Sequence, residues 1–426
     1  MLVKDRGKRI ACEMNTIGIL KNPIQEYAWG SLTAIPELLG TRNRSNKPQA
    51  ELWMGAHPKA PSEVEYDGKR VSLLELIDRN PEAILGKRVA QKFDNRLPYL
   101  FKVLAAAKPL SIQAHPNLQQ ARQGFELETT AGISLDAPHR NYRDANHKPE
   151  CICALTPFWA LCGFRKISDL IAYFEAICAE GMKNELAQLA NNQDTAGLRR
   201  FFTFLMALDG DQRKKIISEA KPNIHERRTE DPVFEWILRL LNEYPDDIGI
   251  FSPIFLNLIC LEPGQALFLA AGQLHAYLDG VGIELMANSD NVLRGGLTAK
   301  HIDVPELLRI LQFDEFKVEI LNPKNRRPCE FVYPSPVEEF VLSTIELKPN
   351  VAYKSEPKRS VEILLCTAGA ADFIDTGRHN TISIKKGMAV IVPAVAPDYE
   401  INGKATFYKA SVPSKKPGIW NTEPDL

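Results

Sequence analysis

The spacing of hydrophobic positions changes twice along the chain. Up to about residue 165, apolar residues come in short runs such as 99–104, bounded by glycine and proline, which is typical of strands. Between about 166 and 248 they recur every three or four positions, as at Phe201, Phe204 and Leu205, which predicts amphipathic helices. Short alternating runs return from about residue 249. The pattern therefore predicts a mainly β protein interrupted by an α-helical insertion.

A cluster of prolines between residues 323 and 336 separates the later β segments. The many short strands with glycine and proline turns favour barrels or jelly rolls. With 426 residues, the chain exceeds the roughly 250–300 at which a single core stops growing. We expect an N-terminal extension (1–14), a first β domain (15–165 with 249–322), a helical domain (166–248) and a second β domain (323–426).

One segment of the chain echoes another. Residues 263–271 and 386–394 share a turn glycine, an apolar run and a small residue, at an offset of 123. The same offset places His275 opposite Asp398. A duplication predicts two related β units, of which the first carries a working site and the second has a supporting role. Chance similarity between two short β strands is the alternative.

Composition excludes several classes of function. Lys and Arg number 52 against 53 Asp and Glu, a formal net charge of −1, so nothing indicates binding to nucleic acid or anionic membranes. The N-terminus lacks the apolar core of a secretory signal, and the apolar stretch 249–261 is shorter than the ~20 residues that span a bilayer. The eight cysteines form no Cys-x-x-Cys pair and mostly have apolar neighbours, which favours buried free thiols. We expect a cytoplasmic protein.

Candidate metal ligands occur in three separate segments. Strand alternation across residues 110–115 puts Gln113 and His115 on one face. Other β segments add Glu150 and His275. Two imidazoles, a carboxylate and an amide without a thiolate suit Zn²⁺ or another divalent first-row ion, and a single carboxylate leaves such an ion a strong Lewis acid. Histidines that are merely hydrogen-bonded within the fold are the competing interpretation.

Several longer motifs resemble a known family. Residues 142–150 and 275–300 resemble two signature stretches of type I phosphomannose isomerases, and shorter motifs at 25–30, 50–58 and 111–116 follow the same order. The resemblance extends from about Gly18 to the C-terminus. It implies two cupin-like jelly rolls with a helical insertion, and one Zn²⁺ held by Gln113, His115, Glu150 and His275. Gly295 and Ala299 depart from the family pattern, which usually has alanine and proline there.

The family's reaction is the reversible conversion of mannose 6-phosphate and fructose 6-phosphate through an enediol. We therefore expect a small sugar phosphate as ligand, no nucleic acid or membrane partner, and a monomer. Arg294 is the candidate cation near the reacting oxygens or the phosphate. For the general base, Glu284 and Lys148 are preferred over Asp290 and His147, and the choice among them stays open.

The substrate's phosphate requires hydrogen-bond donors and positive charge. Ser111 and Lys102 match family positions associated with phosphate, and Lys300 is a third candidate. Two other functions compete with an isomerase. An Fe(II) cupin oxygenase also uses two histidines and a carboxylate, but Gln113 as a fourth ligand argues against it. A non-catalytic sugar-phosphate sensor would be free to lose Arg294 or a ligand, and this chain has kept them all.

Overall fold

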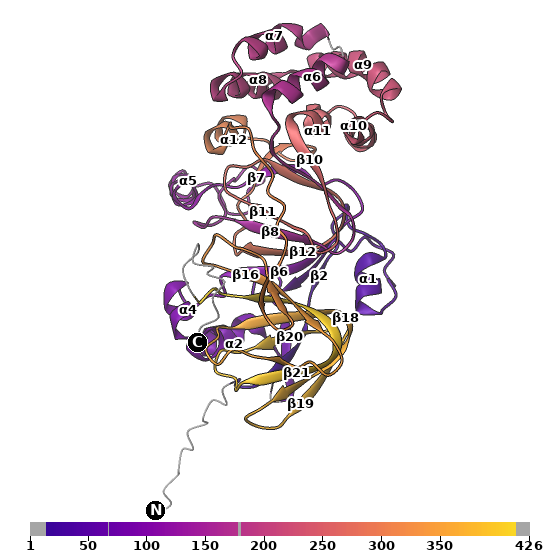
Figure 1. Cartoon of the computed structure of the whole chain (residues 1–426). Coiled ribbons are helices and arrows are strands. Elements are labelled where there is room, and N and C mark those ends of the chain that lie inside the picture. The colour runs from indigo at the N-terminus through magenta and orange to yellow at the C-terminus, as the bar shows by residue number, and fades with distance from the viewer. Residues whose placement is uncertain (1–13, 67, 178–179, 415–426) are drawn as a thin grey trace, which may run out of the picture.

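The computed structural model describes residues 14–66, 68–177 and 180–414, so all of the expected extension except Met14 lies outside the described residues. Helices occupy one end of an elongated molecule, a first β unit lies in the middle, and a second β unit forms the other end (Figure 1). The mainly β fold with a helical insertion is confirmed. No helix among the described residues is long and apolar enough to cross a membrane.

The first β unit is a ten-stranded antiparallel sheet. Its central strand β12 (His275–Ala287) pairs with β6 and β8 over one half of its length, and with β7 and β9 over the other. The remaining strands are β2 (Ile24–Gln25), β3 (Glu51–Met54), β6 (Tyr99–Ala106), β7 (Ile112–Ala114), β8 (Glu150–Ala154), β9 (Phe158–Phe164), β10 (Leu256–Leu261), β11 (Ala266–Leu269) and β13 (Leu293–Gly296). Several chain segments thus meet around one strand.

The second β unit is an eleven-stranded sheet that contains three strands from near the N-terminus. Its strands are β1 (Gly18–Lys21), β4 (Glu63–Tyr66), β5 (Lys69–Ser72), β14 (Lys324–Arg327), β15 (Glu330–Val332), β16 (Val341–Leu347), β17 (Tyr353–Lys354), β18 (Glu362–Asp375), β19 (Thr381–Lys385), β20 (Ala389–Val392) and β21 (Tyr399–Ser411). Gly18 of β1 lies opposite Ile391 of β20. The sequence pattern assigns β1, β4 and β5 to the first β domain, because strand partners so far apart in the chain leave no local signal.

The helical region contains α6 (Ile167–Ile177), α7 (Lys183–Asn191), α8 (Thr195–Ala207), α9 (Gly210–Glu226) and α10 (Pro232–Glu243). The start of α10 follows from its sequence, since the Asp231 side chain accepts a hydrogen bond from the Val233 amide and Pro232 occupies the first turn. Phe201, Phe202 and Leu205 of α8 are buried in the helical core.

Other helices join these elements and flank the sheets. They are α1 (Ala34–Leu39), α2 (Leu73–Arg79), α3 (Pro81–Leu85), α4 (Lys87–Lys92), α5 (Leu118–Thr130), α11 (Ser252–Phe255), α12 (Val304–Ile310) and the 3₁₀ turns Glu180–Met182 and Ile248–Phe251.

The internal echo corresponds to equivalent strands. β11 and β20 are both four residues long and are offset by 123 positions. The strands that follow them, β12 and β21, are both 13 residues long and begin at His275 and Tyr399. The duplication predicted from the sequence is therefore present in the fold, and Asp398 directly precedes the second of these strands.

The two β units pack against each other through a shared apolar core. Within it, the Tyr333 hydroxyl donates to the carbonyl of Gly264 at 2.7 Å and lies 3.2 Å from the Cys153 sulfur. The six cysteines within the described residues are free, as expected, and Cys12 and Cys178 lie outside that part of the chain.

Candidate metal centre

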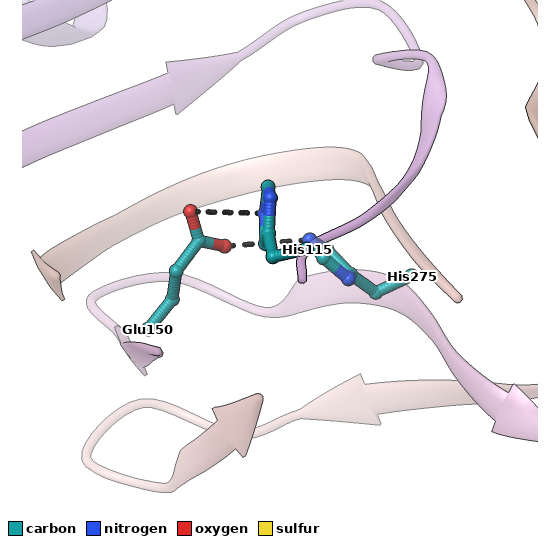
Figure 2. Close-up of side chains that lie close together, drawn as sticks. All are labelled: His115, Glu150 and His275. Atoms are coloured by element: carbon teal, nitrogen blue, oxygen red, sulfur yellow. Dashed lines mark ion pairs between the residues drawn. The ribbon is translucent and has the colours of Figure 1, made fainter. Parts of the chain in front are cut away.

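Two imidazoles and one carboxylate converge inside the first β unit (Figure 2). The two oxygens of Glu150 lie 3.4 Å from Nε2 of His115 and 3.3 Å from Nε2 of His275. The three residues are between 1% and 3% exposed. They converge because His115 directly follows β7, while Glu150 begins β8 and His275 begins β12. This is the one such group of histidine, cysteine and acidic residues within the described chain.

Backbone carbonyls orient both imidazoles. Nδ1 of His115 lies 2.8 Å from the carbonyl oxygen of Asn291, and Nδ1 of His275 lies 3.0 Å from that of Gln273. A carbonyl only accepts, so Nδ1 carries the proton in each ring and Nε2 presents its lone pair towards Glu150.

An unsatisfied nitrogen shows that this donor set fits a divalent metal ion. Nε2 of His115 is buried without a hydrogen-bond partner. Burial, with the charge of Lys148 adding to it, lowers the pKa of His115 to about 4, which keeps the imidazole neutral as a metal ligand must be. A metal ion would fill the coordination left open by this nitrogen.

The fourth expected ligand lies on the same face of the sheet. Gln113 of β7 is directly opposite His275 of β12 and Arg294 of β13, so the three side chains share one face. The Gln113 amide nitrogen donates to the hydroxyl of Ser111 at 3.3 Å. The amide oxygen is the atom with which Gln113 would hold a cation.

Lys148 lies beside the cluster. Its ammonium is 3.0 Å from an oxygen of Glu150. Burial alone would raise the pKa of Glu150, but the positive charge of Lys148 outweighs it and holds that pKa well below its usual value. Glu150 is therefore ionised, as a metal ligand requires.

A second buried group consists of Glu51, Lys102 and Glu284. The ammonium of Lys102 lies 2.8 Å from Glu284 and 3.7 Å from Glu51. The indole of Trp53 donates to Glu51 at 2.6 Å. Burial, and the nearby charges of Glu150 and Glu51, raise the pKa of Glu284 against the opposing effect of Lys102. A carboxylate with a raised pKa beside a fixed ammonium suits proton transfer at neutral pH.

Three cations form a separate group that the sequence analysis identified only in part. The pKa of Arg294 is lowered by burial and by Arg143, and that of Lys300 by burial, Arg294 and Arg143. Within the described residues, neither Arg294 nor Lys300 has an ion-pair partner. Arg143 was missed, although it lies inside the 142–150 motif. Its backbone amide donates to the Asn291 side chain at 2.7 Å, which ties it to the residue that orients His115.

Asp290 pairs with cations other than Arg294. Its carboxylate lies 2.9 Å from the ammonium of Lys59 and 3.6 Å from Nε2 of His57. Burial opposes ionisation, but hydrogen bonds from His57 and Lys59 lower the pKa of Asp290. A carboxylate held so firmly in its ionised form is a weak proton acceptor, so this environment does not favour Asp290 as the base.

Tyr277 is a second residue that sequence reasoning missed. Its hydroxyl is buried and has no hydrogen-bond partner. Burial, and the carboxylates of Glu284 and Glu150, raise its pKa well above 10. The hydroxyl therefore stays protonated as a donor between the two acidic groups. Its position two residues after His275 on the same strand is the signal that would have found it.

Both departures from the family pattern lie behind the cation group. A Cβ atom on Gly295 would come within 3.1 Å of the Leu274 side chain. Gly295 and Ala299 line a cavity of about 520 Å³, together with Tyr244 and Asp247. Neither departure adds or removes a group that faces the metal cluster.

Comparison with known proteins places the chain and its fold in one family. Residues 18–167 match the model for the catalytic domain of type I phosphomannose isomerase, and residues 177–256 match its helical insertion domain. The chain is 43% identical over 356 residues to mannose-6-phosphate isomerase of Salmonella typhimurium, covering 83% of this chain and 89% of the relative. It is 34% identical over 404 residues to the Homo sapiens enzyme, covering 87% and 92%.

Solved structures agree with these matches. A zinc-bound mannose 6-phosphate isomerase superposes with a TM-score of 0.87 at 38% identity, covering 93% of this chain and 99% of that one. A mutant of phosphomannose isomerase from Salmonella typhimurium gives 0.88, with the same identity and coverage. Two cupin-like β units with a helical insertion and a buried His–Glu–His cluster define a class of metal-dependent sugar-phosphate isomerases. The chain belongs to the type I phosphomannose isomerase family.

Proposed function

We propose that this protein interconverts mannose 6-phosphate and fructose 6-phosphate. The observation that carries the proposal is the buried cluster of His115, Glu150 and His275 beside the Lys102–Glu284 pair. Relatives named mannose-6-phosphate isomerase align over most of the chain, which supports this substrate pair.

The metal would be one Zn²⁺ per chain, held by Gln113, His115, Glu150 and His275. Two imidazole nitrogens and two oxygens suit zinc, and a related structure contains it. Bound zinc supplies positive charge that stabilises the charge developing on the sugar oxygens during the reaction.

Glu284 is the proposed base for the proton that moves between C1 and C2. Burial raises its pKa towards the working pH, and Lys102 fixes its position at 2.8 Å. The protonated Tyr277 hydroxyl lies near Glu284 and donates to a substrate oxygen. Lys148, 3.0 Å from Glu150, stabilises negative charge on the enediol or relays a proton. Asp290 arranges His57 and Lys59 and takes no part in the proton transfer.

The phosphate is assigned to the cation group of Arg143, Arg294 and Lys300. Two of these cations have no ion-pair partner within the described residues, so a dianion would relieve their mutual repulsion. Ser111 contributes a hydroxyl donor beside Gln113. Lys102 is engaged by two carboxylates, so we place it with the base and not with the phosphate.

We propose the domain division expected from the sequence, with one change. We infer a catalytic unit (15–165 with 249–322), a helical unit (166–248) and a C-terminal unit (323–426) that is completed by β1, β4 and β5. The matched helical-domain model, residues 177–256, supports the middle boundary to within several residues. We further propose a monomer located in the cytoplasm, where free thiols such as Cys151 and Cys153 stay reduced.

One assay tests the function. Zinc-replete protein is given mannose 6-phosphate, and fructose 6-phosphate is measured with and without a chelator. We expect turnover that the chelator abolishes and added zinc restores. His275→Ala should lose both zinc and turnover, whereas His139→Ala, which changes an exposed histidine, should keep both. Absence of product from replete protein would refute the isomerase proposal, and chelator-resistant turnover would refute the zinc requirement.

A further inference from the structure

The two β units share the same strand order. Five strands of the first unit follow β3–β6–β12–β8–β11, and five of the second follow β15–β16–β21–β18–β20, all antiparallel. Each residue of the first site that lies on these strands therefore has a register-equivalent position in the second unit.

The metal ligand Glu150 has a carboxylate as its equivalent. Glu150 begins β8 and lies opposite Leu269, the last residue of β11. Glu362 begins β18 and lies opposite Val392, the last residue of β20. Leu269 and Val392 are separated by the same offset of 123 positions as the echo in the sequence. Glu362 thus occupies the place of Glu150.

The proposed base has a cation as its equivalent. Glu284 lies between Lys102 and Ile152, two positions along β8 from Glu150. Lys409 lies between Ser343 and Leu364, two positions along β18 from Glu362. Lys102 of β6 therefore corresponds to Ser343 of β16, and Glu284 of β12 corresponds to Lys409 of β21.

The third carboxylate is retained as well. Glu51 lies opposite Leu104, two positions after Lys102. Glu330 lies opposite Ile345, two positions after Ser343. The second unit therefore keeps the equivalents of Glu51 and Glu150 as acids.

In the second unit, Glu330 and Glu362 both contact the ammonium of Lys409. Nζ of Lys409 lies 2.6 Å from Oε1 of Glu330 and 3.2 Å from Oε1 of Glu362, and donates to the Tyr353 hydroxyl at 3.0 Å. Lys409, Glu330 and Glu362 are between 0% and 4% exposed. In the first unit, His115 and His275 lie next to Glu150, the counterpart of Glu362. The strand that begins with His275 in the first unit begins with Tyr399 in the second, so no imidazole stands there.

The inward oxygens of the two acids depend on Lys409 for a positive charge. Oε2 of Glu330 pairs with Arg327 at 2.6 Å. Oε2 of Glu362 accepts from the Tyr399 hydroxyl at 2.9 Å and lies 3.7 Å from Nε of Arg359. Ser343 donates to Oε1 of Glu330 at 3.0 Å, but it brings no charge. The oxygens that face the centre would therefore require another cation if the ammonium were absent.

We propose that the second β unit contains a degenerate copy of the first site, in which the Lys409 ammonium stands at the place of Glu284 and neutralises the acids at the places of Glu150 and Glu51. The ammonium of Lys409 fills this site, and the oxygen atoms around it belong to Glu330, Glu362 and Tyr353. Removal of Lys409 opens it to a hard divalent cation, for which Ca²⁺ is the probe, because oxygen ligands favour Ca²⁺ whereas the imidazoles of the first site favour zinc.

Stability measurements test the role of the ammonium. Lys409→Met keeps most of the side-chain volume but leaves two buried carboxylates without their central charge, and should lower the melting temperature of the zinc-loaded protein by roughly 10 °C. The triple variant Lys409→Met, Glu330→Gln, Glu362→Gln removes the ammonium together with both carboxylate charges and should recover part of that loss, because Arg327 keeps Glu356 and Arg359 keeps Asp398 as partners. A Lys409→Met protein as stable as the unsubstituted chain, or a triple variant no more stable than the single one, would overturn the proposal. If Lys409→Met fails to fold, the yield of soluble protein is compared instead, and the triple variant should give more of it than Lys409→Met.

Calcium binding tests the latent site. Zinc-loaded Lys409→Ala should bind one Ca²⁺ per chain by calorimetry and gain melting temperature as Ca²⁺ is added. The unsubstituted chain should bind none. Lys409→Ala with Glu362→Gln is the matched control, because it has the same space without the carboxylate, and it should not respond. A folded Lys409→Ala protein that ignores Ca²⁺, or a control that responds equally, would refute a cation site at this position.

Discussion

Glu284 and Lys102 are direct cross-strand partners on β12 and β6, and their side chains form a buried ion pair of 2.8 Å. Register alone brings them together, since residues opposite each other in an antiparallel pair project from the same face. Glu150 lies two residues along the neighbouring strand from the partner of Glu284, so the pair and the metal cluster share one interior surface.

Replacing Glu284 should separate metal binding from proton transfer. Glu284→Gln removes the proposed base but none of the clustered ligands, so we expect turnover to fall about 10²–10⁴-fold with unchanged zinc content. The checks are kcat with mannose 6-phosphate and metal analysis. Glu262→Gln changes an exposed carboxylate before β11 and should behave like the unsubstituted protein. Normal turnover by Glu284→Gln would assign the base elsewhere, with Lys148 as the next candidate.

Removing the Tyr277 hydroxyl should lower activity without lowering stability. The buried hydroxyl makes no hydrogen bond of normal geometry, although it lies close to Glu284, so Tyr277→Phe strands no donor and leaves Glu284 paired with Lys102. We expect about a 10-fold fall in kcat, equal to one lost hydrogen bond in the transition state, and a melting temperature at least as high as before.

Tyr244→Phe provides the matched comparison. The Tyr244 hydroxyl donates to the carbonyl of Pro109 at 3.0 Å, so its loss should cost about 1 kcal/mol of stability and leave kcat unchanged. If Tyr277→Phe retained full kcat, the hydroxyl would have no contact with the substrate.

Arg143 should contribute to binding of the phosphate. Arg143→Gln removes one of three mutually repelling cations, and we expect KM for mannose 6-phosphate to rise about 10-fold, as for one lost charge-assisted contact. Inhibition by inorganic phosphate should weaken in parallel. Arg122→Gln removes an exposed arginine from α5 and controls for the change in net charge. A fall in kcat with KM and phosphate inhibition unchanged would contradict the assignment.

Stability should depend on acid through Glu330 in the second unit. Burial opposes ionisation, but Lys409 and Arg327 outweigh it and lower the pKa of Glu330 to about 2. A carboxyl with a lowered pKa in the folded state binds fewer protons than in the unfolded chain. Its contribution, on the order of 3 kcal/mol, is complete above about pH 5 and is lost as the pH falls towards 2.

Denaturant unfolding at pH 7, 4 and 3 checks this contribution. Glu330→Gln should be less stable at pH 7, and the difference from the unsubstituted chain should shrink with acid. Glu346→Gln, an exposed change on β16, should leave the pH dependence as it was. A constant difference between Glu330→Gln and the unsubstituted chain across this range would show that the carboxyl is not ionised in the native state.

The local sequence pattern was sufficient to predict the helical insertion, the types of metal ligand and the duplication of the β unit. Apolar spacing located the helical insertion, and proline at the start of α10 with Asp231 before it marked a helix start that the structure contains. The ligand types at His115, Glu150 and His275 were visible because each lies beside a short, recognisable strand. The echo between β11 and β20 predicted the duplication, since short-range order and residue chemistry are written in consecutive positions.

Pairing between distant strands decided which residues of the sites lie side by side. Which strands meet is decided by the burial of whole faces, so the sequence showed neither β1 in the C-terminal sheet nor Asp290 between His57 and Lys59. The same holds for Arg143, which looks like any motif arginine until folding sets it beside Arg294 and Lys300. Lys409 is the clearest case. Nothing around it in the chain marks a counterpart of the first site, because its equivalence to Glu284 exists only in the register of strands that lie far apart in sequence.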